Sequence, residues 1–153
     1  MKVTAVLLAA GQGTRMKSSL PKVLHPLCGK PMLWHVLEAL KSAATEKPVV
    51  VIGHGADEVK KYLGDSADCV LQEPQLGTGH AAMQAEPLLK GKTDMVIVTY
   101  ADMPLLRGET FQRLADACAE LGIEDLDGYG ERGAVERLER EIAVTLGKPA
   151  AVL

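Results

Sequence analysis

The chain is poor in aromatic residues and cysteines, and it lacks an apolar run long enough to cross a membrane. Phenylalanine, tryptophan and tyrosine make up 3% of the 153 residues, so the core has to be built from aliphatic side chains. The three cysteines are far apart in the sequence and odd in number, which argues against a disulfide framework and favours a reducing, cytoplasmic location. The apolar run at the N-terminus is interrupted at Gly11, too early for a signal peptide or a membrane span. We therefore expect a cytoplasmic protein with no membrane partner.

An excess of positive charge is also missing. The formal net charge is −3 at pH 7, which argues against a nucleic-acid partner because nucleic-acid-binding surfaces are usually basic. Apolar residues make up 47% of the chain, so disorder is not the default, and a chain of this length can bury a real core. The composition predicts one folded domain of ordinary size, with room for a local cationic pocket.

Apolar runs alternate with stretches of helical periodicity along most of the chain. Strands are expected at residues 3–9, 48–52, 68–72 and 94–99, and helices at residues 31–44, 56–63, 78–90 and 108–121. Such alternation predicts an α/β fold, with a mainly parallel sheet covered by helices on both faces. Ligands of such sheets bind beyond the carboxyl ends of the strands, so three loops are expected to meet at one site. These loops are residues 10–22, 72–80 and 100–106.

The loop after the first strand combines small residues with two cations. Its candidate residues are Gly11, Gly13, Arg15 and Lys22. Small residues let a base and phosphates approach the backbone, and backbone N–H groups with two cations can hold a polyphosphate. The dinucleotide fingerprint is absent because Met16 takes the third glycine position, and a P-loop is absent because Pro31 follows Gly29-Lys30. The loop predicts nucleotide binding, and the alternative is a glycine-rich turn with no ligand.

The two later loops offer polar groups of a different kind. Gln72 and Gln75 carry amides that can pair with the hydrogen-bonding edge of a pyrimidine, and Gly77 lets the backbone close on a flat ring. Thr78 can contact the base, or it can simply cap the helix that follows. Asp102 comes directly after a strand, where it is placed to hold Mg²⁺, a cation that prefers carboxylates, water and phosphates. The alternative for Asp102 is a turn-forming Asp-x-Pro.

Several motifs, in order and spacing, resemble a known family. They are Leu8-Ala9-Ala10-Gly11 with Gly13-Thr14-Arg15-Met16, Pro21-Lys22-Val23-Leu24-His25, Gln75-Leu76-Gly77-Thr78-Gly79-His80-Ala81 and Tyr100-Ala101-Asp102-Met103-Pro104-Leu105. The first resembles the signature of sugar-phosphate nucleotidyltransferases. Together they closely resemble the uridylyltransferase domain of the bifunctional N-acetylglucosamine-1-phosphate uridylyltransferase/glucosamine-1-phosphate acetyltransferases. The resemblance runs from about residue 3 to about residue 117.

The resemblance implies a nucleotide-diphospho-sugar transferase fold, Rossmann-like and here truncated, with a nucleotidyltransferase core at residues 1–117. It implies that UTP and N-acetylglucosamine 1-phosphate react to give UDP-N-acetylglucosamine and pyrophosphate, with Mg²⁺ as cofactor. The partners would be a nucleoside triphosphate and a sugar 1-phosphate. The implied residues are catalytic Arg15 and Lys22; nucleotide-binding Leu8, Ala9, Ala10, Gly11, Gly13, Lys22, Gln72, Gln75, Gly77 and Thr78; substrate-binding Tyr100 and Ala101; and metal-binding Asp102.

The chain departs from the family at a few places. Gln12 stands where members often carry lysine, and Ala101 replaces the usual glycine before the aspartate. Residues 118–153 do not resemble the later segments of the family and are expected to form an atypical helical extension, with an amphipathic helix at residues 134–146. Two alternatives therefore stay open: a nucleotide-binding remnant without turnover, and a nucleotidyltransferase for another sugar phosphate or base. The sequence leaves the oligomeric state unknown.

Overall fold

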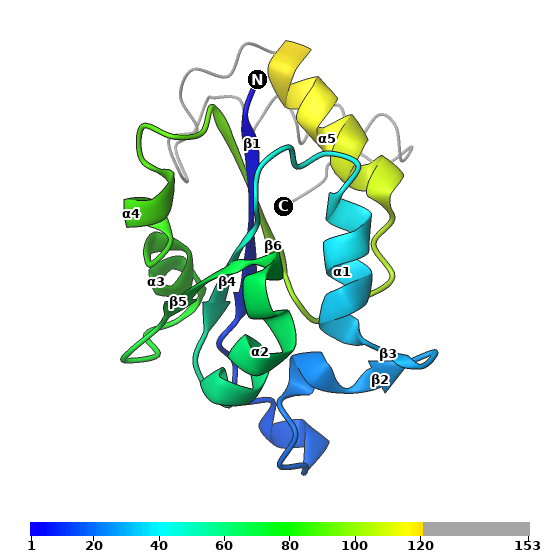
Figure 1. Ribbon diagram of the computed structural model, residues 1–153, viewed down its shortest axis with the longest axis vertical. Helices are drawn as coiled ribbons and strands as arrows, with labels where there is room; N and C mark the ends of the chain where they lie inside the picture. The colour runs from blue at the N-terminus through cyan, green and yellow to red at the C-terminus, as the bar shows by residue number, and fades with distance from the viewer. Residues whose placement is uncertain (121–153) are drawn as a thin grey trace, which may run out of the picture. The chain divides into compact units, whose positions relative to one another are not determined.

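A four-stranded parallel sheet forms the centre of the fold (Figure 1). The computed structural model describes residues 1–120, and the chain divides into two units, Met1–Arg113 and Leu114–Leu153. The strands are β1 (Val3–Ala9), β4 (Val49–Ile52), β5 (Asp68–Leu71) and β6 (Met95–Tyr100), in the spatial order β5-β4-β1-β6. β1 pairs in parallel with β4 and with β6, and β4 pairs in parallel with β5. The expected parallel sheet is confirmed.

Helices cover both faces of this sheet, as the alternation of elements predicts. α1 (Met32–Leu40) and α2 (Ala56–Leu63) lie on one face, and α3 (Thr78–Met83) and α4 (Glu86–Leu89) lie on the other (Figure 1). The remaining helix, α5 (Gly108–Glu120), follows β6 in the chain. None of the helices among residues 1–120 is long and apolar enough to cross a bilayer.

The core is aliphatic on both faces of the sheet. Alternate side chains of a strand point to opposite faces of the sheet, so in β1 Val6 and Leu8 lie on one face and Leu7 lies on the other. On the α3 face, Val6 packs with Val49, Val51, Ala81 and Ala85. The largest side chains that are fully buried are Leu7, Leu33, Leu40, Val6, Val36, Val50, Val51 and Val59. Buried leucine and valine side chains therefore fill the space that aromatic side chains occupy in many other cores.

Three alternate side chains of β6 are exposed. Among the described residues it pairs with β1 alone, which makes it an edge of the sheet. Val96, Val98 and Tyr100 are 37%, 50% and 47% exposed, whereas Ile97 and Thr99 are buried. One side of this strand therefore remains open to solvent.

The long loop at residues 10–30 has short elements that periodicity does not reveal. It contains the single 3-10 turns Thr14–Met16 and Lys22–Leu24 and a small hairpin of β2 (Pro26–Leu27) and β3 (Lys30–Pro31). The hairpin turns at Cys28 and Gly29, which both have positive φ, 50° and 78°. This is the arrangement that two-residue hairpins require to match the twist of their strands.

Two expected helices are shorter in the structure. The helix expected at residues 78–90 is divided into α3 and α4, because Pro87 lies at the start of α4 and a proline ring collides with the carbonyl one turn earlier. The helix expected at residues 31–44 ends at Leu40, and the following N–H groups of Ala43 and Ala44 both donate to the Leu40 carbonyl. The helix expected at residues 134–146, and all but three residues of the expected extension, lie outside the described residues.

The burial of α1 gives a test of the fold. Leu33 is fully buried, so Leu33→Ala is expected to lower the free energy of unfolding by about 2–5 kcal/mol, through lost apolar contact and the cavity left behind. Leu105 is 85% exposed, and Leu105→Ala is expected to change it by less than about 0.5 kcal/mol. Urea unfolding followed by circular dichroism measures both. Equal effects of the two substitutions would contradict the packing of α1 described here.

Candidate functional site

A cavity of about 400 Å³ lies beyond the carboxyl ends of β1, β5 and β6. Because parallel strands all end at the same edge, the loops that follow them meet there, as expected from the sequence. The walls from β1 and its loop are Leu8, Ala9, Ala10, Gly11, Gly13, Arg15, Lys22 and Val23. The loop after β5 and the start of α3 contribute Gln72, Gln75, Gly77, Thr78 and Ala81, and the end of β6 contributes Tyr100 and Asp102.

The structure brings every residue of the predicted site except one to this cavity. The exception is Ala101, which is fully buried and whose N–H donates to the Leu8 carbonyl at 3.1 Å, continuing the β1–β6 pairing. Two wall residues were not predicted, Val23 and Ala81, which are 6% and 4% exposed. Both lie within motifs that carry the family resemblance, Pro21-Lys22-Val23-Leu24-His25 and Gln75-Leu76-Gly77-Thr78-Gly79-His80-Ala81, and this is the signal that could have found them.

An ion pair joins two walls of the cavity. The Lys22 ammonium contacts the Asp102 carboxylate, and the two residues are 80 positions apart in the chain. Their side chains are 32% and 28% exposed, so both charges remain partly in contact with solvent. The pair places one cationic and one anionic group side by side on the cavity wall.

Asp102 is suited to hold a divalent cation, because its carboxylate faces the cavity and already accepts a cationic partner there. Within residues 1–120 there is no cluster of three or more His, Cys, Asp or Glu side chains that would form a metal site by themselves. A cation at Asp102 would need further oxygen ligands from water or from a phosphate-bearing molecule, which is the usual coordination of Mg²⁺.

Gln72 is a buried amide at the back of the cavity. It is 5% exposed, and its Nε2 donates to the Gly77 carbonyl at 2.9 Å. The same nitrogen lies 3.2 Å from Nδ1 of His80, and the other ring nitrogen of His80 lies 3.1 Å from Nε2 of Gln84. These contacts fix the loop after β5 against α3, so Gln72 has a defined orientation before any ligand binds.

Gln75 connects the loop after β5 to the end of β1. Its Nε2 donates to the Ala10 carbonyl at 2.9 Å. The same carbonyl accepts the backbone N–H of His54 at 3.2 Å, from the turn after β4. The Ala10 carbonyl is therefore the point at which the loops after β1, β4 and β5 are joined.

The sheet and its cavity define an α/β domain with a ligand site at the carboxyl ends of its strands. Residues 5–127 match the family model described as the MobA-like NTP transferase domain, and the chain belongs to this family.

The chain is similar to the bifunctional protein GlmU of Bacillus velezensis, with 45% identity over 148 residues that cover 88% of this chain and 32% of the relative. It is also similar to the bifunctional protein GlmU of Exiguobacterium sibiricum, with 48% identity over 135 residues that cover 82% of this chain and 30% of the relative. The chain thus spans about a third of the length of the curated relatives it matches. These similarities confirm the resemblance to a uridylyltransferase region.

Among solved structures, the fold is similar to a nucleotidyl transferase from Methanothermobacter thermautotroptrophicus. The TM-score is 0.66 and the sequence identity 27%, over 75% of this chain and 57% of the other. This likeness confirms the expected nucleotide-diphospho-sugar transferase fold.

The ion pair in the cavity is expected to contribute little to folding. In a double-mutant cycle with Lys22→Met and Asp102→Asn, we expect a coupling of about 0.5–1 kcal/mol in the free energy of unfolding, falling as salt is added, because the pair is partly solvated. The measurement is urea unfolding of the four proteins at low and high ionic strength.

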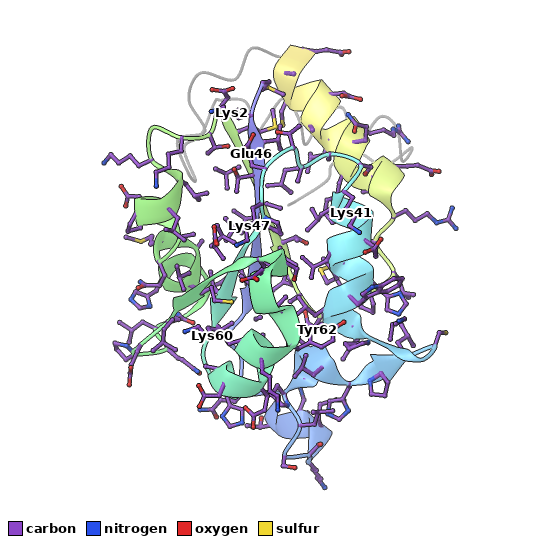
Figure 2. All side chains as sticks on the ribbon, viewed as in Figure 1. Lys2, Lys41, Glu46, Lys47, Lys60 and Tyr62 are labelled. Atoms are coloured by element: carbon purple, nitrogen blue, oxygen red, sulfur yellow. The ribbon has the colours of Figure 1, made fainter. Side chains whose placement is uncertain are left out.

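The surface pair Lys47–Asp68 is the matched control. Its side chains are 46% and 49% exposed and its atoms 2.7 Å apart. Asp68 begins β5, and Lys47 follows Glu46, which lies near the N-terminal end of β1 (Figure 2). We expect a coupling no larger than that of Lys22–Asp102. A coupling above about 3 kcal/mol for Lys22–Asp102, typical of a buried pair, would contradict this account.

Proposed function

We propose that this chain transfers the uridylyl group of UTP to N-acetylglucosamine 1-phosphate, giving UDP-N-acetylglucosamine and pyrophosphate. The observation that carries the proposal is the meeting of Arg15, Lys22 and Asp102 at one cavity built from three loops. The second support is the 45–48% identity to relatives named bifunctional protein GlmU. We assign the activity to residues 1–117, which include every residue of the cavity wall, and regard residues 118–153 as an extension.

The reaction is an in-line displacement at the α-phosphorus of UTP. A phosphate oxygen of the sugar 1-phosphate forms a bond to the α-phosphorus, and the bond from that phosphorus to the oxygen bridging the α- and β-phosphates breaks. The electron pair of the broken bond leaves with pyrophosphate. The attacking oxygen is already anionic, so the protein supplies no base, and catalysis rests on positioning and on charge stabilisation.

Arg15 and Lys22 are the groups that neutralise the phosphates in this proposal. Both line the cavity, on the loop after β1, and Lys22 is free to turn to a phosphate once its contact with Asp102 is replaced. Mg²⁺ bound at Asp102 would supply further charge neutralisation on the triphosphate. Asp102 holds and orients that cation, while the Arg15 guanidinium offers paired donors to phosphate oxygens.

The uracil is held, in this proposal, by other groups of the cavity wall. The backbone of Ala10 and Gly11 lines the cavity together with Gln72, Gly77 and Thr78, and these groups provide donors and acceptors for the edge of a pyrimidine. The buried amide of Gln72 is fixed by its bond to the Gly77 carbonyl, so it presents its oxygen in one orientation.

The sugar lies near Tyr100 in this proposal. Tyr100 lines the cavity and is 47% exposed, which leaves its ring available to a bound sugar nucleotide. Ala101 is buried behind it, so we propose that it acts through its backbone position rather than by a side-chain contact.

A second candidate is nucleotide binding without turnover. The observation that favours it is that Asp102 is the one carboxylate among the described residues that line the cavity, since a cation held by one protein ligand is oriented less firmly. A third is transfer from another nucleotide or to another sugar phosphate. The same assay separates the three.

Pyrophosphate release tests the proposal. The wild-type chain is incubated with UTP, N-acetylglucosamine 1-phosphate and Mg²⁺, and release is expected to be robust and to disappear in Asp102→Ala. Arg15→Ala and Lys22→Ala are each expected to lower kcat/KM roughly a hundredfold to a thousandfold, the usual effect of removing one charge-stabilising donor. Asp68→Ala, which removes an exposed carboxylate paired with Lys47, is the control and is expected to leave release unchanged.

Each other outcome contradicts the proposal in its own way. Tight UTP binding with no release would indicate a binding protein. Equal turnover with CTP or TTP would indicate a nucleotidyltransferase that does not select uracil. Release that persists in Asp102→Ala would exclude Asp102 as the group that holds the metal.

A further inference from the structure

The turn between β4 and α2, Gly53-His54-Gly55, lies outside the cavity wall but contacts residues that belong to it. Both glycines are packed against segments that carry site residues: Gly53 against Ala10, which follows β1, and Gln75 in the loop after β5, and Gly55 against Pro21 in the loop after β1. On the sequence alone this turn only separates a strand from a helix.

Because Gly53 has no side chain, Gln75 has room to form a hydrogen bond with Ala10 at the end of β1. A Cβ atom at position 53 would lie 2.8 Å from the Ala10 carbonyl oxygen and 2.8 Å from Nε2 of Gln75. These two atoms are the partners of the 2.9 Å hydrogen bond that joins the loop after β5 to β1. The same Cβ would lie 2.9 Å from Cβ of Ala10, so it could not move away from one partner without approaching another.

Gly55 has the corresponding role for the loop after β1. Its φ is +67°, and a Cβ there would lie 2.3 Å from Cγ of Pro21 and 3.2 Å from Cβ of Pro21. Pro21 is buried and directly precedes Lys22 at the start of a 3-10 turn. A proline ring cannot rotate out of the way, so a side chain at position 55 would displace the backbone that carries Lys22.

Gly13 holds Lys22 from the other side. A Cβ at Gly13 would lie 2.8 Å from Cβ of Lys22. Lys22 therefore sits on a segment packed between Gly13 and, through Pro21, Gly55. Its ammonium reaches Asp102 from this position.

We infer that Gly53 and Gly55 are positioning residues for two separate halves of the site. Gly53 sets the place of Gln75 on the side that we assign to the base, and Gly55 sets the place of Lys22 on the side that we assign to the phosphates and the metal. The inference rests on the proposed function, and it adds that this turn controls nucleotide selection and turnover independently without touching the ligand.

Gly53→Ala tests the first half. We expect UTP affinity, measured by titration calorimetry, to fall roughly five- to tenfold, the effect of one lost hydrogen bond, and selection of UTP over CTP to weaken. With saturating UTP, kcat is expected to stay within about twofold of wild type, since the atoms nearest to that Cβ belong to Ala10 and Gln75 and not to Arg15, Lys22 or Asp102. In a Gln75→Ala background the effect of Gly53→Ala is expected to be smaller, because the two changes act on one contact.

Gly55→Ala tests the second half. We expect kcat for pyrophosphate release to fall roughly a hundredfold, because displacement of a catalytic group by about 1 Å has effects of that size, while selection of UTP over CTP is unchanged. Adding Pro21→Ala removes the ring atom that Cβ of residue 55 would strike, so the double variant is expected to regain most of the lost kcat. If Gly55→Ala alone folds poorly, the double variant can still be assayed and still tests the inference.

Gly91→Ala is the matched control for backbone strain. Gly91 has φ +72°, close to that of Gly55, but a Cβ there would meet nothing within 4 Å. We expect it to lower the free energy of unfolding by about 1–2 kcal/mol and to leave both kcat and UTP affinity unchanged.

The failure of this inference is distinct from failure of the proposed function. If the wild-type chain neither binds UTP nor releases pyrophosphate, the proposed function is wrong. If wild type is active and Gly53→Ala and Gly55→Ala both behave like Gly91→Ala, the positioning role is wrong. Loss of kcat and of UTP selection together in each variant would also contradict it, because the two halves would then not be set separately.

Discussion

β1 pairs in parallel with β4 on one side and with β6 on the other, and the site follows from this pairing. The register aligns Leu8 with Val51 and with Tyr100, and Ala9 with Ile52, so the ends of the three strands lie level. The chain leaves each of them at the same edge of the sheet. Residues separated by most of the described chain, such as Lys22 and Asp102, then come into direct contact. Buried valine and leucine side chains on both faces stabilise the pairing, so the position of the loops depends on the aliphatic core.

Two of the three charged groups that line the cavity, Lys22 and Asp102, neutralise one another, and Arg15 adds a further positive charge. The Lys22 ammonium forms an ion pair with the Asp102 carboxylate, so each group has a partner of opposite charge. Under the proposed function, Lys22 would contact phosphate oxygens in place of the carboxylate, and Asp102 would hold a divalent cation in place of the ammonium. Because the pair is partly solvated, separating it requires little free energy.

The sequence was sufficient for the features that depend on local pattern. Continuous apolar runs predicted the strands, and the two cations and two glycines after Val3–Ala9 predicted where the cavity would lie. The sequence was insufficient for features that depend on contact with a residue far away in the chain. Nothing near Gly53 or Gly55 in the chain shows that Gln75 and Pro21 occupy the space a side chain would need. The direct contact of Lys22 with Asp102 likewise depends on register and not on either motif. Pro87 is the instructive exception, because it was visible in the sequence and still divides a helix that periodicity alone predicted as continuous.

Steric packing positions the loops of the site more than the ion pair and the hydrogen bond between them do. The ion pair contributes about 1 kcal/mol at most, and the hydrogen bond from Gln75 to Ala10 about 0.5–1.5 kcal/mol. Contributions of this size would leave each loop several accessible positions. Close contact at Gly13, Gly53 and Gly55 reduces the number of positions that each loop can take. Atoms near van der Waals distance cannot pack differently unless the backbone moves. Steric contacts of this kind do not weaken with salt, whereas charge pairs do. Under the proposed function the site binds polyphosphate, and its charge balance changes with every ligand. Its geometry is then kept because packing, more than electrostatics, determines where its charged groups lie.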